Sequence, residues 1–334
     1  MTGPFDADPI VVEVIRDGLV ESVHRARVAV TGPDGAPVAG IGSVQAPMFP
    51  RSALKPLQAV AMLRAGLELD PDLLALVCAS HSGEGIHLDG VRRILAGAGL
   101  DETALDNTAD WPLDERARED QLRAGGSPSR LAMNCSGKHA GMLATCVRNG
   151  WPLTAYRRAD HPLQRAVRET VDELAGEASG TPAVDGCGAP AFPLSLTGLA
   201  RAFGRLAAAA SGPERVVADA VRTHPEMVSG TRRDEYLLHQ AVPGLVTKAG
   251  AEAVQAVGLA DGRGVAIKVD DGGPRARPVV TAAVLAVLGL DHPTLTAQAS
   301  APVLGHGEPV GVIQVRAGVL DHLGERRRAD PEPL

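Results

Sequence analysis

Strand-forming residues gather at both ends of the chain, and helical patterns occupy the region between them. Runs rich in β-branched residues occur at 11–15 and 27–30, and again at 264–269 and 309–316. Such runs favour strands. Two groups of strands separated by a long helical region suggest that both ends contribute to one sheet. We therefore predict an α/β (α+β) fold with an antiparallel sheet formed by N- and C-terminal strands, flanked by helices, and with a helix-rich central insertion.

The helical patterns are rich in Ala and Leu, and several begin with a start signal. Asp70 precedes a proline, which places a capping carboxylate and a proline in the first turn of a helix. Pro162 stands at the start of another pattern. Helices are predicted at 57–67, 70–77, 87–98, 161–174 and 213–223, with a further helix at 279–290 between the two C-terminal strands.

No low-complexity linker divides the 334 residues. One catalytic domain is therefore predicted over residues 1–323, with its sheet drawn from about 10–45 and 264–316 and its helix-rich middle from about 57–240. Three arginines at 326–328 are followed by Ala-Asp-Pro-Glu-Pro. This composition predicts a flexible tail over residues 324–334.

Composition and charge disfavour several classes of partner. The formal net charge is -7 and aromatic residues make up 2% of the chain, which argues against binding nucleic acid. Acidic residues interrupt the first apolar runs, and no stretch approaches the roughly 18 apolar residues of a membrane helix. We expect a cytoplasmic protein that binds neither nucleic acid nor membrane. Its four cysteines are then reduced thiols or metal ligands.

A Ser-x-x-Lys pattern at Ser52 and Lys55 is the first candidate for chemistry. Residues i and i+3 share a face of a helical turn, so the lysine amine can reach the serine hydroxyl. A neutral amine there can accept the hydroxyl proton and make the serine a nucleophile. Arg51 adds a positive charge that favours a neutral lysine, whereas Pro56 disfavours helical angles at Lys55. Taken alone, the pattern is explained better by a chance pair of surface residues.

A second polar segment, Asn134-Cys-Ser-Gly-Lys-His139, comes directly before an apolar stretch. It does not match a phosphate-binding loop, because Ala132 stands where that loop needs a glycine and His139 where it needs Ser or Thr. A loop feeding a helix N-terminus suits an anion or a carboxylate. A turn with a buried cysteine and a capping serine is the alternative.

Cys135 in this segment and Cys187 in Asp185-Gly-Cys187 form a candidate metal site. Two thiolates can bind a soft metal such as zinc, but they supply only half of a tetrahedral site. A third ligand would come from Lys138, His139 or Asp185. From spacing alone, buried thiols without a metal are the favoured interpretation.

Ser80 and Lys268 form a second candidate pair. The segment Cys78-Ala-Ser-His-Ser-Gly-Glu84 delivers Ser80 at a break after a predicted helix. Lys268 lies in an otherwise apolar strand pattern, where its burial is costly without a function or a partner. Ser80 would be such a partner, and Lys55 and Lys268 in one pocket would each favour the neutral form of the other.

Together these segments resemble the asparaginase family typified by the inducible, thermolabile L-asparaginase of Rhizobium etli. The match is specific because the segments occur in the family's order over most of the chain. They are Arg51-Ser-x-x-Lys55-Pro-x-Gln58, Cys78-Ala-Ser-His-Ser82 with Glu84, Asn134-Cys-Ser-Gly-Lys-His139 with Gly141-Met-Leu143, Asp185-Gly-Cys187, His224-Pro-Glu-Met-Val228, and Ala266-Ile-Lys-Val with Asp271-Gly272.

The resemblance implies a fold like that of serine β-lactamases and glutaminases, and hydrolysis of L-asparagine to L-aspartate and ammonia. It implies that Ser52 is the nucleophile with Lys55 as its base, and that Ser80 and Lys268 form the second pair. It implies that Arg51, His139 and Asp185 position the substrate. It also implies that Cys135, Lys138 and Cys187 bind a zinc ion. The resemblance also implies a homodimer.

Other functions remain open from the residues alone. A penicillin-recognising or β-lactamase-like serine hydrolase shares the Ser-x-x-Lys pattern, and Lys248-Ala-Gly250 partly matches its Lys-Thr-Gly element. A glutaminase is the related alternative. A non-enzymatic regulator that binds a metal or an amino acid through Cys135 and Cys187 is disfavoured, because no segment resembles an output module.

Overall fold

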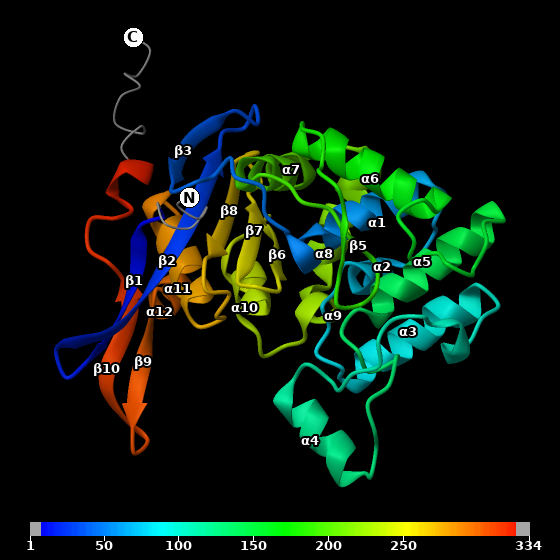
Figure 1. The fold of residues 1–334 in the computed structure, drawn as a ribbon, viewed down its shortest axis with the longest axis horizontal. Helices are drawn as coiled ribbons and strands as arrows, with labels where there is room; N and C mark the ends of the chain where they lie inside the picture. Colours follow the sequence, from blue (N-terminus) through cyan, green and yellow to red (C-terminus); the bar gives the residue numbers. More distant parts are fainter. Residues whose placement is uncertain (1–7, 325–334) are drawn as a thin grey trace.

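The structure is a computed structural model that describes residues 8–324. A sheet and a helical region lie side by side, with the sheet on the left of Figure 1 and most helices on the right. Within the described residues one sheet holds eight strands in the order β6-β7-β8-β2-β1-β10-β9, with β3 paired to β2. Its pairings are antiparallel. The predicted α/β (α+β) fold, with an antiparallel sheet formed by strands from both ends of the chain, is confirmed.

Strand β2 joins the two halves of the sheet. It pairs with β1 on one side and with β8 on the other, where Arg27 lies opposite Lys268. The sheet consists of β1 (Ile10–Arg16), β2 (Leu19–Thr31), β3 (Pro37–Ile41), β6 (Val246–Gly250), β7 (Val254–Gly258), β8 (Gly264–Val269), β9 (Ser300–Gly305) and β10 (Glu308–Val315). A small separate sheet pairs β4 (Ala183–Val184) with β5 (Pro190–Ala191).

The C-terminal part of the sheet begins earlier than predicted, because β6 and β7 precede residue 264. Both strands carry polar side chains that are fully buried, Lys248 in β6 and Gln255 in β7. Buried polar residues remove the alternation of apolar and polar positions by which a strand is recognised. Strand β6 is the edge strand of the sheet on the side nearest the helical region (Figure 1).

The predicted helices are all present, with ends shifted by a few residues. Helices α4, α7, α9, α10 and α12 were not predicted. The helices are α1 (Lys55–Arg64), α2 (Pro71–Val77), α3 (Gly85–Gly97), α4 (Glu115–Arg123), α5 (Ser136–Asn149), α6 (Pro162–Ala175), α7 (Leu196–Ala208), α8 (Gly212–Thr223), α9 (Pro225–Ser229), α10 (Asp234–Ala241), α11 (Ala276–Val287) and α12 (Pro293–Gln298). Short 3₁₀ turns occur at η1 (Arg51–Leu54), η2 (Glu102–Ala104) and η3 (Asp321–Leu323).

Each face of the sheet is part of a different apolar core. Val28 and Ile267 point toward α11, whereas Ala29 and Ala266 point toward α7 and the other helices. Glycines let α7 lie directly on the strands: a Cβ on Gly264 would lie 1.9 Å from the Ala200 carbonyl oxygen. This close packing fixes the helical region against the sheet face on which the candidate site is built.

Two further expectations concern membrane-spanning helices and the C-terminal tail. Among the helices of residues 8–324, none has the length and apolar character needed to cross a bilayer. The predicted flexible tail, 324–334, lies outside the described residues except for Gly324.

Candidate active site

Ser52 lies on a tight turn held against strand β6. Arg51, directly before it, has a φ of 55°, a left-handed conformation that is uncommon for residues with a side chain. Gly250 allows β6 to approach, since a Cβ there would lie 2.3 Å from the Pro50 carbonyl oxygen. Ser52 itself remains partly exposed. The turn therefore presents the serine beside the edge strand, where a ligand can reach it.

Lys55 begins helix α1, and its side chain is buried. Its φ of -58° and ψ of -39° are helical, so Pro56 does not distort this turn. Proline is tolerated in the first turn because the amide it lacks has no helical partner there. Lys55 Nζ donates to the Ala79 carbonyl oxygen at 2.5 Å and to Ser80 Oγ at 3.0 Å. The described contacts thus join Lys55 to Ser80, with Ser52 one turn away.

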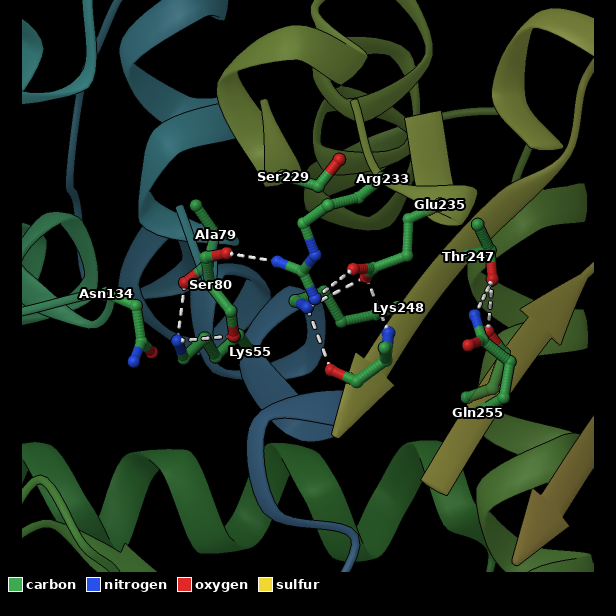
Figure 2. A network of polar contacts seen from close by, with 12 residues as sticks. Lys55, Ala79, Ser80, Asn134, Ser229, Arg233, Glu235, Thr247, Lys248 and Gln255 are labelled. Atoms are coloured by element: carbon green, nitrogen blue, oxygen red, sulfur yellow. Dashed lines mark hydrogen bonds and ion pairs between the residues drawn. The ribbon is translucent and has the colours of Figure 1, made fainter. Parts of the chain in front are cut away.

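A second buried lysine approaches this site from strand β6. Lys248 Nζ donates to Glu235 Oε1 at 2.9 Å, and both side chains have an exposed fraction of 0%. Arg233 contacts Glu235 Oε2 through Nη2 at 2.8 Å and donates from Nη1 to the Ser80 carbonyl oxygen at 2.7 Å. Figure 2 shows the resulting network, which runs from Lys55 through Ser80, Arg233 and Glu235 to Lys248.

The charges of this network influence one another. Burial lowers the pKa of Lys248 to about 8, against the effect of Glu235 and with that of Arg233 and Lys55. Burial alone would raise the pKa of Glu235, but Lys248 and Arg233 hold it well below its usual range. Near neutral pH the pair therefore carries both charges, with a second lysine close by.

The structure corrects the expected pairing of Ser80 with Lys268. Lys268 Nζ donates to the carbonyl oxygens of Glu252 and Val269, at 2.7 and 2.6 Å, and not to Ser80. The sheet order explains this result, because β7 separates β8 from β6. Two strand spacings amount to about 10 Å, which puts Lys268 away from the strand that borders Ser80.

Cys135, Lys138 and Cys187 lie together and are buried. Lys138 Nζ donates to Cys187 Sγ at 3.2 Å. A hydrogen bond from the Cys135 thiol, followed by the charge of Lys138, lowers the pKa of Cys187 strongly, while the same thiol contact raises the pKa of Cys135. Burial opposes a charged Lys138, but the nearby thiolate raises its pKa. The cluster therefore favours a charged sulfur on Cys187 beside the Lys138 amine.

The remaining predicted residues surround that cluster. Arg51 contacts Asp185 Oδ1 from Nε and Nη2, each at 2.8 Å, so the turn before Ser52 is tied to the loop that holds Cys187. His139 is fully buried, with Nδ1 2.7 Å from the hydroxyl of Tyr156. Burial lowers the pKa of His139 to about 4. A neutral, enclosed His139 is suited to orienting its neighbours.

The donor set fits a zinc ion in part. Two thiol sulfurs and a lysine nitrogen meet at one place, and a thiolate is already favoured there. Among residues 8–324, no group of three or more His, Cys, Asp or Glu side chains is arranged to hold a metal. A zinc ion would therefore depend on Lys138 as its third protein ligand, with the lysine in its neutral form.

The segments that contain Ser52, Ser80, Cys135 and Cys187 lie together in the structure. Three further residues of the site were not predicted. His81 joins two of the segments, since its N–H donates to the Asn134 carbonyl oxygen at 3.1 Å. The site also includes Lys248, Glu235 and Arg233. They lie in a part of the chain where the sequence pattern predicted no functional residue. The partial Lys-Thr-Gly match was the one pointer to Lys248, and no pattern pointed to Glu235 or Arg233.

Comparisons with known proteins agree with the resemblance. The chain matches the family model for L-asparaginase II over residues 12–315. It belongs to the L-asparaginase II family. Membership implies an amidohydrolase that acts on asparagine, as the sequence predicted. A comparison with curated protein sequences finds no match.

The solved structures to which the chain shows some similarity include a β-lactamase and a glutaminase. A β-lactamase from Mycobacterium bovis is 17% identical with a TM-score of 0.45, covering 78% of this chain and 94% of that one. A probable glutaminase from Bacillus subtilis, complexed with 6-diazo-5-oxo-L-norleucine, is 13% identical with a TM-score of 0.31, covering 74% of this chain and 77% of that one.

Proposed function

We propose that the protein hydrolyses L-asparagine through an acyl-enzyme formed on Ser52. The observation that carries the proposal is the 3.0 Å hydrogen bond from Lys55 Nζ to Ser80 Oγ, one turn from the partly exposed Ser52. Ser80 is 6% exposed and already bonded to the lysine, which suits a proton carrier. Ser52 has the access that a nucleophile needs.

The reaction then follows from the roles of three side chains. Ser52 Oγ attacks the side-chain amide carbon of asparagine while its proton moves to neutral Lys55. The carbon–nitrogen bond breaks as a proton passes from Lys55 through the Ser80 hydroxyl to the nitrogen, which leaves as ammonia. Water attacks the ester, gives its proton to the same residues, and releases L-aspartate with Ser52 restored.

Arg51 and Asp185 are proposed to position the substrate. They bring one positive and one negative charge beside Ser52, with side chains 26% and 16% exposed. A free amino acid carries both charges, so such a pair can orient its carboxylate and its ammonium group. His139 would orient its neighbours through its contact with the Tyr156 hydroxyl.

The test is ammonia release from L-asparagine, L-glutamine and their D-forms. We expect L-asparagine to be the best substrate, and Ser52→Ala to reduce kcat by a factor of about 10³ or more. Ser211→Ala is the matched control, since Ser211 is exposed and precedes α8 without a capping bond. Unchanged turnover by Ser52→Ala would overturn the assignment of the nucleophile.

We also propose a zinc ion held by Cys135, Lys138 and Cys187. A bound zinc ion would supply positive charge and hold the Asp185–Cys187 loop against the start of α5. Metal analysis should find close to one zinc ion per chain. Cys135→Ala should lose it and Cys146→Ala, a buried cysteine elsewhere on α5, should keep it. Full zinc content in Cys135→Ala would contradict the site.

A homodimer is proposed as the assembly, on the basis of the family resemblance. Light scattering should then give about twice the chain mass of 34.5 kDa. A mass near that of a single chain over the concentrations used in the assay would contradict it.

One observation favours a second candidate, a penicillin-recognising hydrolase. Lys248 and Gly250 occupy the edge strand beside Ser52 and match two positions of the Lys-Thr-Gly element. Acylation of Ser52 by a fluorescent penicillin, with no ammonia released from amides, would favour this reading over asparagine hydrolysis.

A further inference from the structure

A buried carboxylate, Glu235, connects the two sides of the candidate active site. It is the second residue of α10, and its side chain is fully buried. Its Oε1 accepts hydrogen bonds from Lys248 Nζ at 2.9 Å and from the Ala249 amide at 2.7 Å, both on strand β6. Its Oε2 faces Arg233, whose other nitrogen holds the Ser80 carbonyl oxygen (Figure 2).

Stability alone gives little reason for such an arrangement. Buried ions lose most of their hydration, and apolar side chains of similar size usually stabilise a core at least as well. The network is also placed beside the reacting groups, because Arg233 contacts the residue that Lys55 contacts. A buried pair at that position indicates a role in the reaction.

We propose that Glu235 is a positioning residue for hydrolysis, which fixes Arg233 against the main chain of Ser80 and keeps Lys248 an ammonium group beside Lys55. This inference rests on the proposed function and deepens it. The charge of Lys248 also lies close to the reacting groups, because Lys55 is near enough to influence it. Glu235 thereby holds Lys248 and Arg233 in place beside the contact between Lys55 and Ser80.

Several charged or titratable groups face Lys248 and Glu235 from the surrounding elements. They are Lys55 from α1, Cys78 at the end of α2, Arg233 before α10, His239 within α10 and Arg277 from α11. Burial raises the pKa of Cys78 to about 12 and lowers that of His239 to about 4, so both are neutral around pH 7. Glu235 is then the negative charge that is in contact with Lys248.

The experiment compares Glu235→Gln with Asp234→Asn. Asp234 is the matched control: it is the adjacent carboxylate of the same helix, and its ion pair is with Arg277, at 2.8 Å, instead of with Lys248 or Arg233. We expect Glu235→Gln to lower kcat for L-asparagine by about 10- to 100-fold, the range for a misplaced catalytic group. KM should change less than about three-fold, because a fully buried side chain does not touch substrate. Asp234→Asn should keep the kcat.

The pH profile is the readout that a merely structural role would not move. The activity of the unmodified enzyme should fall as pH rises through the pKa of Lys248, about 8. Without the carboxylate the ammonium form of Lys248 is less favoured, so this falling limb should move to lower pH by about 1–3 pH units. Glu235→Asp restores the charge with a shorter reach, and should return the limb toward its original pH with only partial recovery of kcat.

Labelling by a fluorophosphonate, followed by intact mass, separates this inference from the proposed function. A protein that is labelled on Ser52 but releases no ammonia contradicts the proposed function, and labelling rates against pH then decide the role of Glu235. Equal kcat and pH profiles in Glu235→Gln and the unmodified enzyme overturn the inference. If Glu235→Gln does not fold by circular dichroism, a Glu235→Asp variant with unchanged kcat and pH profile overturns it equally. A protein that neither reacts with the reagent nor hydrolyses amides overturns both.

Discussion

Two buried lysines lie on the same face of the same sheet, but their surroundings differ. Lys248 on β6 and Lys268 on β8 have exposed fractions of 0% and 8%. Lys248 contacts a carboxylate and lies near Lys55, whereas Lys268 donates to two main-chain carbonyl oxygens. One of those oxygens belongs to Glu252, in a turn where Glu252 and Ala253 both have positive φ. A buried lysine can thus belong to a reacting site or secure a strained turn.

The difference follows from what lies beside each strand. Strand β6 is at the edge of the sheet order and borders η1, and its lysine contacts Glu235 in the first turn of α10 and lies near Lys55. Strand β8 is enclosed between β7 and β2, and its lysine meets Arg27 and Asp270. Position in the sheet, more than residue type, separates the two roles.

Among the changes that test this comparison, removing Lys248 has the largest expected effect. Lys248→Met should lower kcat for L-asparagine by about 10²-fold or more, the scale of a lost acid–base or electrostatic group. It should also destabilise the fold, since Glu235 loses a buried partner. Steady-state kinetics with a thermal melt of the same sample measures both. Turnover within three-fold of the unmodified enzyme would remove Lys248 from the site.

Replacing Lys268 should produce the opposite pattern. Lys268→Met leaves two carbonyl oxygens without their donor, which should reduce the free energy of unfolding by about 1–3 kcal/mol. Its kcat should stay within about three-fold of the unmodified enzyme, because no reacting group depends on it. Urea denaturation and ammonia release are the two measurements. A large loss of kcat in a fully stable Lys268→Met protein would invert the comparison.

The smallest effect is expected at Asp270, beside Lys268. Burial, and then the charge of Asp8, raises the pKa of Asp270 to about 6, above its value of about 4 in an unfolded chain. The stability that protonated Asp270 contributes is therefore fully present below pH 4 and is lost as pH rises through 6. Asp270→Asn should raise Tm at pH 8 by about 2–4 °C and leave it unchanged at pH 4. Equal gains at both pH values would exclude titration as the cause.

Local patterns in the sequence were sufficient for much of the fold and part of the site. The β-branched runs near both termini predicted the terminal strands, and proline start signals located α2 and α6. Strands β6 and β7 escaped because buried Lys248 and Gln255 interrupt the apolar pattern. In the site, Ser52 and Lys55 share one turn, so their proximity needed no tertiary knowledge.

The role of Lys248 could not be predicted from local sequence patterns. Lys268 stands in the more regular strand pattern, which predicts a role for it, whereas Lys248 belongs only to a partial motif match. Arg233 directly precedes the short helix α10, and Glu235 lies in its first turn. No sequence pattern predicted this helix. Their contacts with Ser80 and Lys248 join residues that are far apart in the sequence, and no spacing rule reports such contacts.

By itself the sequence determined the strands at both ends, the helical middle, and the turn that carries Ser52 and Lys55, because backbone propensity and the helical repeat act over a few residues. The tertiary structure decided that Lys55 contacts Ser80, that Glu235 pairs with Lys248, and that Cys187 lies beside Cys135 and Lys138. Those contacts depend on strand order and helix packing, and both are set by burial of the whole chain.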